Sequence, residues 1–135
     1  MLETTFANLR HWAVVGVSDN PQKYGNKIFK QLLAAGYAVQ AVNPKLTTVE
    51  GCPCYPNLQA LPTKPAVISV VVPPALGVSI VEDCLALGIQ NIWFQPGAES
   101  EAAIAKAQAG GMNVLANACI LLSYKSWDED PLPKQ

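Results

Sequence analysis

Short apolar runs recur along this chain and alternate with stretches whose apolar residues follow a helical period. An apolar run this short, bounded by glycine, proline or asparagine, is typical of a strand buried on both faces of a sheet. Five such runs predict strands, and they span residues 13–17, 38–42, 66–72, 91–94 and 113–116. The run at 66–72 is the most apolar and is rich in β-branched residues, which favours a central position in the sheet.

Helical periodicity fills the intervals between these strands. From Gly25, apolar residues recur at i, i+3, i+4, i+7 and i+8, which predicts a helix that Gly36 ends. The Pro73-Pro74 pair suits the first turn of a second helix, which closes at Gly88. A third helix, rich in alanine, is predicted over 99–109.

Strands that alternate with helices build a mostly parallel sheet with helices on both faces, because the crossovers are right-handed. We therefore predict an α/β fold, a Rossmann-like three-layer sandwich with a sheet of five or six strands. The sixth is a brief edge strand near Cys54 and Tyr55, in a proline-rich segment that also holds a helical turn near 58–61. The length predicts a single domain, 1–125, followed by a flexible C-terminal tail, 126–135.

Composition and charge narrow the classes of partner. The formal net charge is −1, so the chain lacks the basic surplus with which nucleic-acid-binding proteins neutralise phosphates. No apolar run approaches the roughly 20 residues that span a bilayer, and the N-terminal segment lacks the apolar core of a signal peptide. We expect a cytoplasmic protein that binds neither nucleic acid nor membrane.

The four cysteines do not form a recognisable metal site. Cys52 and Cys54 are separated by a single residue and no second pair follows, which does not match the spacing of zinc ligands. The single histidine, His11, has no neighbouring ligand candidate. We expect no bound metal and reduced thiols.

The first strand–helix loop has the composition of an anion site. Ligands of parallel α/β sheets bind beyond the carboxyl ends of the strands, and the 16–25 loop leads from such an end to the start of a helix. Backbone N–H groups and the helix dipole bind anions at such a turn, and Ser18 and Lys23 suit a diphosphate. The dinucleotide motif has glycines where this loop has Ser18 and Pro21. The alternative is an ordinary turn, with Asn20 as cap and Pro21 as the first helical residue.

The end of the second strand bears on the kind of nucleotide. An NAD site has Asp or Glu there to hold the ribose diol, whereas this chain has Asn43, Pro44 and Lys45. With no carboxylate present, Lys45 could pair with a phosphate. The pattern favours a nucleotide with a phosphate on its ribose, and both NADP and coenzyme A (CoA) carry one. For Lys45 taken alone, a solvated surface lysine is the simpler interpretation.

Several short motifs occur together in a fixed order: Val-Gly-Val-Ser followed by Tyr-Gly, Ala-Val-Asn-Pro-Lys, Val-Val-Val-Pro-Pro, Trp-Phe-Gln-Pro-Gly and Asn-Ala-Cys-Ile. In this order they resemble the small stand-alone CoA-binding proteins, which are related to the CoA-binding domain of the succinyl-CoA synthetase alpha subunit. The resemblance extends over residues 6–122. It implies a Rossmann-like domain whose cofactor is CoA, bound as CoA or acyl-CoA.

The resemblance also implies roles for individual positions. The loop from Ser18 would hold the CoA phosphates, Lys45 would approach the phosphorylated ribose, and the Val72-Pro73 pair would line the adenosine pocket. The 95–97 segment would follow the pantetheine arm, and Cys119 matches a cysteine at the end of the last strand. The candidate binding residues are Gly16, Val17, Ser18, Lys23, Tyr24, Gly25, Asn43, Pro44, Lys45, Val72, Pro73, Pro74, Gln95, Pro96, Gly97 and Cys119.

Cys119 has two interpretations. At the ligand edge of the sheet, its thiol could form a mixed disulfide with the CoA thiol under oxidation. It could equally be a small buried apolar residue beside Ile120, since free cysteines are among the most buried residue types.

No catalytic set can be assembled from these residues. The synthetase takes its phosphorylated histidine from a second domain, and His11 precedes the first strand, away from the ligand edge. We expect a non-enzymatic CoA-binding protein. The alternatives are a small NADP-binding oxidoreductase or redox sensor, and a subunit that completes an acyl-CoA synthetase together with another chain. The sequence leaves open the acyl group, the pathway and whether the protein forms a homo-oligomer.

Overall fold

The computed structural model describes residues 2–116. Its elements, in chain order, are α1 (Leu2–Ala7), β1 (His11–Val15), α2 (Tyr24–Ala34), β2 (Ala38–Val42), β3 (Thr48–Val49), β4 (Cys52–Tyr55), the 3-10 helix η1 (Leu58–Ala60), β5 (Val67–Val70), the 3-10 helix η2 (Pro74–Leu76), α3 (Gly77–Leu87), β6 (Asn91–Phe94), α4 (Glu101–Ala109) and β7 (Asn113–Leu115).

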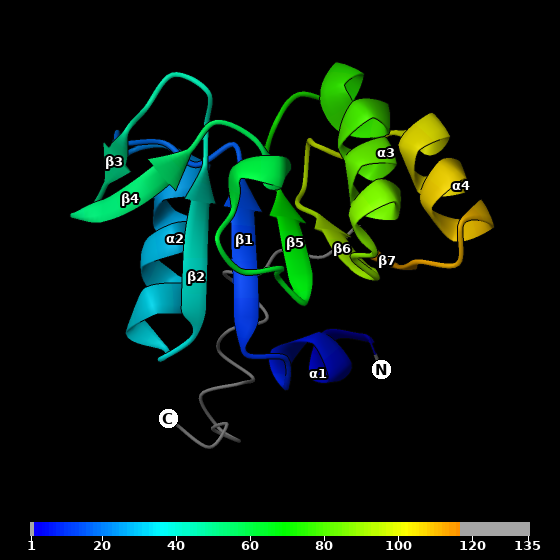
Figure 1. The fold of residues 1–135 in the computed structure, drawn as a ribbon, viewed down its shortest axis with the longest axis horizontal. Coiled ribbons are helices and arrows are strands. Elements are labelled where there is room, and N and C mark those ends of the chain that lie inside the picture. Colours follow the sequence, from blue (N-terminus) through cyan, green and yellow to red (C-terminus); the bar gives the residue numbers. More distant parts are fainter. Residues whose placement is uncertain (1, 117–135) are drawn as a thin grey trace.

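One sheet runs through the molecule, with the strand order β3-β4-β2-β1-β5-β6-β7. Neighbouring strands are parallel except for β3 and β4, which pair antiparallel. Helices lie on both faces of the sheet (Figure 1). The structure therefore confirms the α/β Rossmann-like sandwich, with β1 and β5 adjacent at its centre.

The sheet has seven strands rather than the expected five or six. The additional strand is β3, which pairs with Cys52 and Pro53 of β4. Glu50 and Gly51 connect the two strands, with φ angles of 51° and 78°. Two successive positive φ angles are typical of a type I′ hairpin turn, for which Asn-Gly and Asp-Gly are the usual sequence signals. Glu-Gly does not carry that signal, so the sequence analysis missed this hairpin.

The core is divided in two by the sheet, because successive strand residues point to opposite faces. Ala13, Ile68 and Ile92 pack on the face covered by α3, α4 and η1. Trp12 and Trp93 pack on the other face, together with residues of α1 and α2. A sheet that is buried on both sides needs apolar residues at consecutive positions, which explains why the strands appear in the sequence as continuous apolar runs.

Several element boundaries differ from the prediction. β1 begins at His11, before the predicted run at 13–17, and the α1 helix was not predicted. The second predicted helix opens as the 3-10 turn η2 and becomes α-helical only at Gly77. α4 begins at Glu101 instead of 99, because the Ser100 hydroxyl accepts a hydrogen bond from the Ala103 N–H at 3.2 Å and so caps the helix.

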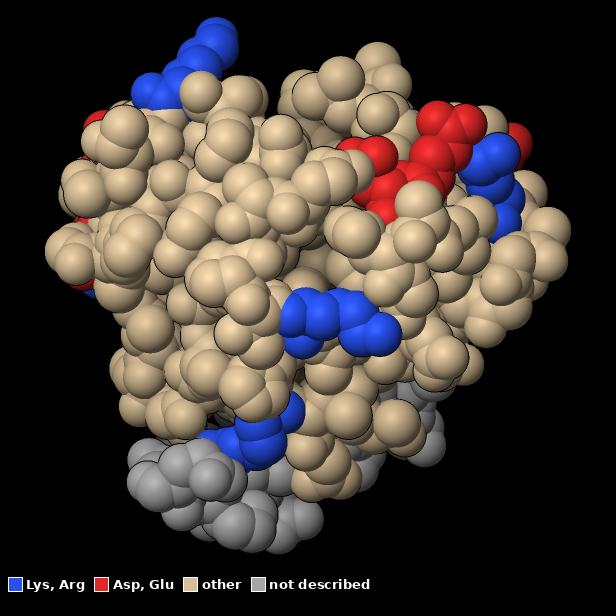
Figure 2. All heavy atoms as spheres, in the orientation of Figure 1, with Lys and Arg blue, Asp and Glu red and all other residues tan. Residues whose placement is uncertain are grey.

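Charged side chains are distributed without a broad basic surface on the visible face. Figure 2 shows acidic side chains together on the α3–α4 side, whereas most basic side chains lie apart from one another. On that side, Lys106 and Glu82 form an ion pair at 3.6 Å. Within residues 2–116, no helix is long and apolar enough to cross a membrane. In the same span, no group of three or more His, Cys, Asp or Glu residues could hold a metal ion.

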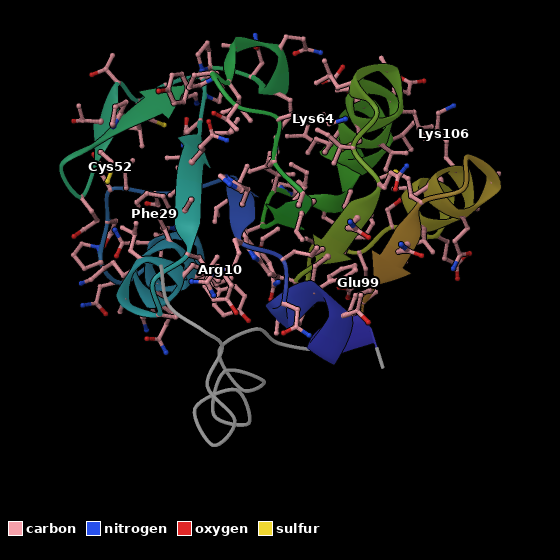
Figure 3. All side chains as sticks on the ribbon, turned by 60° about the horizontal axis from the view of Figure 1, so that its bottom comes forward. Arg10, Phe29, Cys52, Lys64, Glu99 and Lys106 are labelled. Atoms are coloured by element: carbon pink, nitrogen blue, oxygen red, sulfur yellow. The ribbon has the colours of Figure 1, made fainter. Side chains whose placement is uncertain are left out.

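The three described cysteines are free thiols that differ in burial. Cys52 is half-buried at the β3–β4 edge of the sheet (Figure 3), and Cys54 is buried beside the carbonyl oxygen of Asn43, at 3.7 Å. Cys84 is fully buried in α3. Burial raises the pKa of Cys54, and burial with the nearby charge of Asp83 raises the pKa of Cys84 to about 12.

We predict that these thiols react with iodoacetamide in the order Cys52, Cys54, Cys84. Thiolate is the reactive form, and at about pH 8 a thiol with a pKa near 12 holds roughly one ten-thousandth of its population as thiolate. Timed labelling followed by peptide mass mapping measures the order. In denaturant all three should label alike, and rapid labelling of Cys84 in the native protein would contradict the prediction.

Candidate functional site

The strand order reverses between β1 and β5. From β1 the chain proceeds through β2 to β4 on one side, then returns to β5 on the other side of β1. In open α/β sheets a crevice forms at this point, beyond the carboxyl ends of the strands, because the two connecting loops leave in opposite directions.

A pocket of about 450 Å³ lies at this position. It lies beyond the ends of β1, β2 and β5, and is closed by the segment after β4 and by α3. Its lining residues are Val15, Gly16, Val42, Asn43, Pro44, Lys45, Pro56, Asn57, Leu58, Val72, Pro73, Leu76, Ser79, Ile80 and Asp83. The structure thus brings six of the predicted site residues together, from three separate loops: Gly16, Asn43, Pro44, Lys45, Val72 and Pro73.

Gly16 lets the loop after β1 pass close to the end of β5. Its φ is +98°, and a Cβ there would lie 2.8 Å from Val72 Cγ1 and 3.0 Å from the Val71 carbonyl carbon. A side chain would be strained by the backbone conformation and would also clash with Val71 and Val72, directly after β5. The bare backbone of Gly16 therefore forms part of the pocket wall.

Gly25 holds the start of α2 against the same loop. A Cβ at this position would lie 2.5 Å from the Gly16 carbonyl oxygen and 3.2 Å from Val17 Cα. Because both neighbours are backbone atoms, neither can rotate away. The N-terminal end of α2, where backbone N–H groups lack partners in the preceding turn, is thereby held against the backbone of Gly16 and Val17.

Side chains within the loop bond to its own backbone. The Ser18 hydroxyl accepts a hydrogen bond from the Asn20 N–H at 3.0 Å, and Asn20 Oδ1 accepts one from the Gln22 N–H at 2.9 Å. The helix begins at Tyr24 with Lys23 in the cap position, and Lys23 makes no side-chain cap bond. Asn20 therefore stabilises a turn within the loop. The ordinary-turn alternative was wrong to place Asn20 at the helix cap, since that position is occupied by Lys23.

Asn26 fastens this loop to the edge hairpin. It is fully buried, and its Nδ2 donates hydrogen bonds to the Ser18 carbonyl oxygen at 2.9 Å and to Glu50 Oε2 at 3.0 Å. The sequence analysis did not single out Asn26. Its only signal was a polar residue on the otherwise apolar inner face of the predicted helix.

Asn43 links the loops that follow β1 and β2. Its Nδ2 donates a hydrogen bond to the Val17 carbonyl oxygen at 2.8 Å, and its Oδ1 accepts one from the Lys45 N–H at 2.8 Å. An aspartate would place an acceptor against the Val17 carbonyl, so the amide is required here. This bonding holds the backbone of Lys45 at the pocket wall, with its side chain exposed.

The remaining predicted residues do not line this pocket. Gln95 is fully buried, and its Nε2 donates a hydrogen bond to the Ser69 hydroxyl at 3.2 Å, while the Tyr24 hydroxyl donates to its Oε1 at 3.5 Å. Its side chain therefore connects β5, β6 and α2. The neighbouring Pro96 and Gly97 are exposed. The others outside the lining are Val17, Ser18, Lys23, Gly25 and Pro74, whereas Cys119 lies outside the described residues.

A protein-family model described as a CoA binding domain matches residues 10–125. The chain belongs to this CoA binding domain family. The matched span includes all the residues that line the pocket.

This CoA binding domain is similar to several solved structures and curated proteins. A conserved hypothetical protein from Pyrococcus furiosus is 40% identical, with a TM-score of 0.80 over 84% of this chain and 98% of that one. A hypothetical protein from Pyrococcus horikoshii OT3 is 32% identical, with a TM-score of 0.88 over 92% and 88%. The ADP-forming acetate–CoA ligase I of Archaeoglobus fulgidus is 40% identical over 72 residues, which are 53% of this chain and 10% of the ligase.

Part of the pocket in this CoA binding domain was not predicted from the sequence. The missed residues from η2 and α3 are Leu76, Ser79, Ile80 and Asp83, and those after β4 are Pro56, Asn57 and Leu58. Val15 and Val42, the last residues of β1 and β2, were also missed as lining residues. The first group follows helical spacing and could have been found by asking which side of the predicted helix faces the ligand edge. In the second group, Pro56 and Asn57 depend on the path of an irregular loop, for which periodicity gives no information. Leu58 begins η1, where the sequence predicted a helical turn near 58–61.

We predict that Gly25→Ala lowers the free energy of unfolding by about 1–3 kcal/mol, because the added methyl group meets backbone atoms that cannot move aside. Urea denaturation measures the change. Lys27→Ala, at an exposed position of the same helix, is the matched control and should change stability by less than about 0.5 kcal/mol. A stability for Gly25→Ala equal to that of the control would refute the close contact.

Proposed function

We propose that this protein binds CoA, with the adenosine and its ribose phosphate in the pocket and the diphosphate over the 16–25 loop. The observation that carries the proposal is the pocket itself. It lies at the reversal of strand order, in a chain of the CoA binding domain family, and has Lys45 at its wall. Its volume of about 450 Å³ is within the usual range of small-molecule sites.

The walls suit a nucleoside that carries a phosphate. Val72, Pro73 and Leu58 present apolar surface on which a flat base can pack. Lys45 supplies a positive charge beside them, and its side chain is exposed and free to reach a phosphate. At the end of β2 the chain has Asn43, whose amide bonds to backbone groups, in place of the carboxylate that holds an unphosphorylated ribose diol in NAD sites.

The 16–25 loop supports binding of the diphosphate. Gly25 brings the start of α2 against the loop, so the positive end of the helix dipole lies beside the place proposed for the diphosphate. Lys23 is exposed at the cap position of the same helix and adds positive charge. In this proposal the ribose phosphate and the diphosphate have separate cationic partners, Lys45 and Lys23.

For the pantetheine arm we propose the exposed turn after β6. Because the Gln95 side chain is bonded internally, the contacts would come from Pro96 and Gly97. The mixed disulfide between the CoA thiol and Cys119 stays a prediction, since Cys119 lies outside the described residues.

We propose binding without catalysis by this chain alone. The Archaeoglobus relative is an acetate–CoA ligase, but this chain spans a tenth of its length. The single histidine of the chain, His11, is exposed at the start of β1, whereas the pocket lies beyond Val15 at its other end. A role in acyl-CoA chemistry would therefore require residues supplied by a partner.

We predict that CoA binds with a micromolar or lower dissociation constant, and at least about tenfold more tightly than NADP or NAD. Isothermal titration calorimetry with the three ligands measures this. Tighter binding of NADP would replace the proposal with the dinucleotide alternative, and the absence of binding by CoA would disprove it.

We predict that Lys45→Ala weakens CoA binding by about ten- to a hundredfold, because a charge-assisted bond to phosphate contributes roughly 1.5–3 kcal/mol. Dephospho-CoA, which lacks the ribose phosphate, should lose little affinity. Lys30→Ala, which removes an exposed lysine from α2, serves as the control for a change in overall charge. Equal losses for both ligands would mean that Lys45 does not contact that phosphate.

A further inference from the structure

The charged side chains that line the pocket carry opposite signs. Lys45 comes from the loop after β2 and Asp83 from the middle of α3, and the other lining residues are apolar or uncharged. Among residues 2–116, Lys106 and Glu82 form an ion pair, whereas Lys45 and Asp83 do not pair with each other. The pocket therefore has a cationic part and a separate anionic part.

The anionic part belongs to a stripe along α3 and the turn before it. Leu76, Ile80 and Asp83 are spaced four and three residues apart, which places them along one side of a helix, and all three line the pocket. Leu76 is 50% exposed, the one large apolar side chain so exposed among the described residues. A carboxylate beside two apolar side chains suits a flat heteroaromatic ring that carries a hydrogen-bond donor on its edge.

We propose that Asp83 determines base specificity by accepting a hydrogen bond from the 6-amino group of the adenine. This inference rests on the proposed CoA function. A phosphate near Lys45 and the Asp83 carboxylate repel each other, which favours a pose with the carboxylate beside the part of the nucleoside farthest from the ribose phosphate. In adenosine 3′-phosphate that part is the amino edge of the base.

The proposal distinguishes purines by the polarity of one group. On the N7 side of position 6, where we place the Asp83 carboxylate, adenine presents an N–H donor, whereas hypoxanthine and guanine present only the acceptors O6 and N7, because their N1–H donor lies on the opposite side. A carbonyl oxygen facing the carboxylate would leave both acceptors unpaired and would add repulsion. The pocket should therefore reject 6-oxo purines, even though their size and shape are nearly the same.

The test compares CoA with its 6-oxo analogue, in which hypoxanthine replaces adenine, by isothermal titration calorimetry. The wild-type protein should bind CoA about 10- to 100-fold more tightly than the analogue, the magnitude expected of a hydrogen bond to a charged group. In Asp83→Asn the ratio should fall below about threefold, because an amide can accept from the 6-amino group or donate to the 6-oxo group. Glu82→Gln, a neighbouring acid outside the pocket lining, should keep the wild-type ratio.

Each outcome decides between distinct conclusions. A ratio of CoA to analogue affinity near one in the wild-type protein would overturn the role of Asp83 while leaving CoA binding intact. So would an unchanged ratio in Asp83→Asn, which means equal losses for both ligands. If the wild-type protein binds neither ligand, the proposed function itself fails. The wild-type ratio requires no variant to fold, and thermal unfolding checks that Asp83→Asn remains native. Lys45→Ala should weaken both ligands and preserve their ratio, which separates phosphate binding from base selection.

Discussion

The contact between Gly25 and the Gly16 carbonyl oxygen is the constraint on which the arrangement of the ligand edge depends. A side chain at Gly25 would begin 2.5 Å from that oxygen, so the first crossover can pack this closely only without one. With α2 held there, Gly16 in turn passes within reach of Val71 and Val72 at the end of β5. Two glycines thus determine how closely the two central strands and the first helix approach one another, and so where the pocket forms.

Hydrogen bonds from two asparagines complete this arrangement. Asn43 connects the backbone beyond β1 with the backbone beyond β2, and Asn26 connects the 16–25 loop with the edge hairpin. Both side chains donate from their amide nitrogen to a backbone carbonyl oxygen, which an aspartate carboxylate cannot do, and Asn43 also accepts through its Oδ1. At Asn43 one residue therefore has two consequences: it organises the loop, and it keeps a carboxylate away from the strand end where NAD-binding proteins use one.

The sequence predicted the layers of the fold because burial on both faces produces continuous apolar runs that differ clearly from helical periodicity. It also predicted the loops at the ligand edge, since topology places the carboxyl ends of parallel strands together. The β3–β4 hairpin escaped prediction because its Glu-Gly turn lacks the usual signal. Pro56 and Asn57 escaped it because an irregular loop has no period. The resemblance implied ligand contact for Gln95. The inward direction of its side chain was not predictable, because it depends on partners such as Ser69 that only the folded chain brings close.

The β3–β4 hairpin also affects how the sheet meets other molecules. The edge of a sheet exposes unpaired N–H and C=O groups, which can recruit a strand of another chain and lead to aggregation. Here that edge is a strand of two residues, Thr48–Val49, followed by a turn that carries the exposed charge of Glu50. The next strand inward contains Pro53, which has no N–H to donate. So short and interrupted an edge offers little for intermolecular strand pairing, and it protects this side of the sheet while the ligand edge stays open.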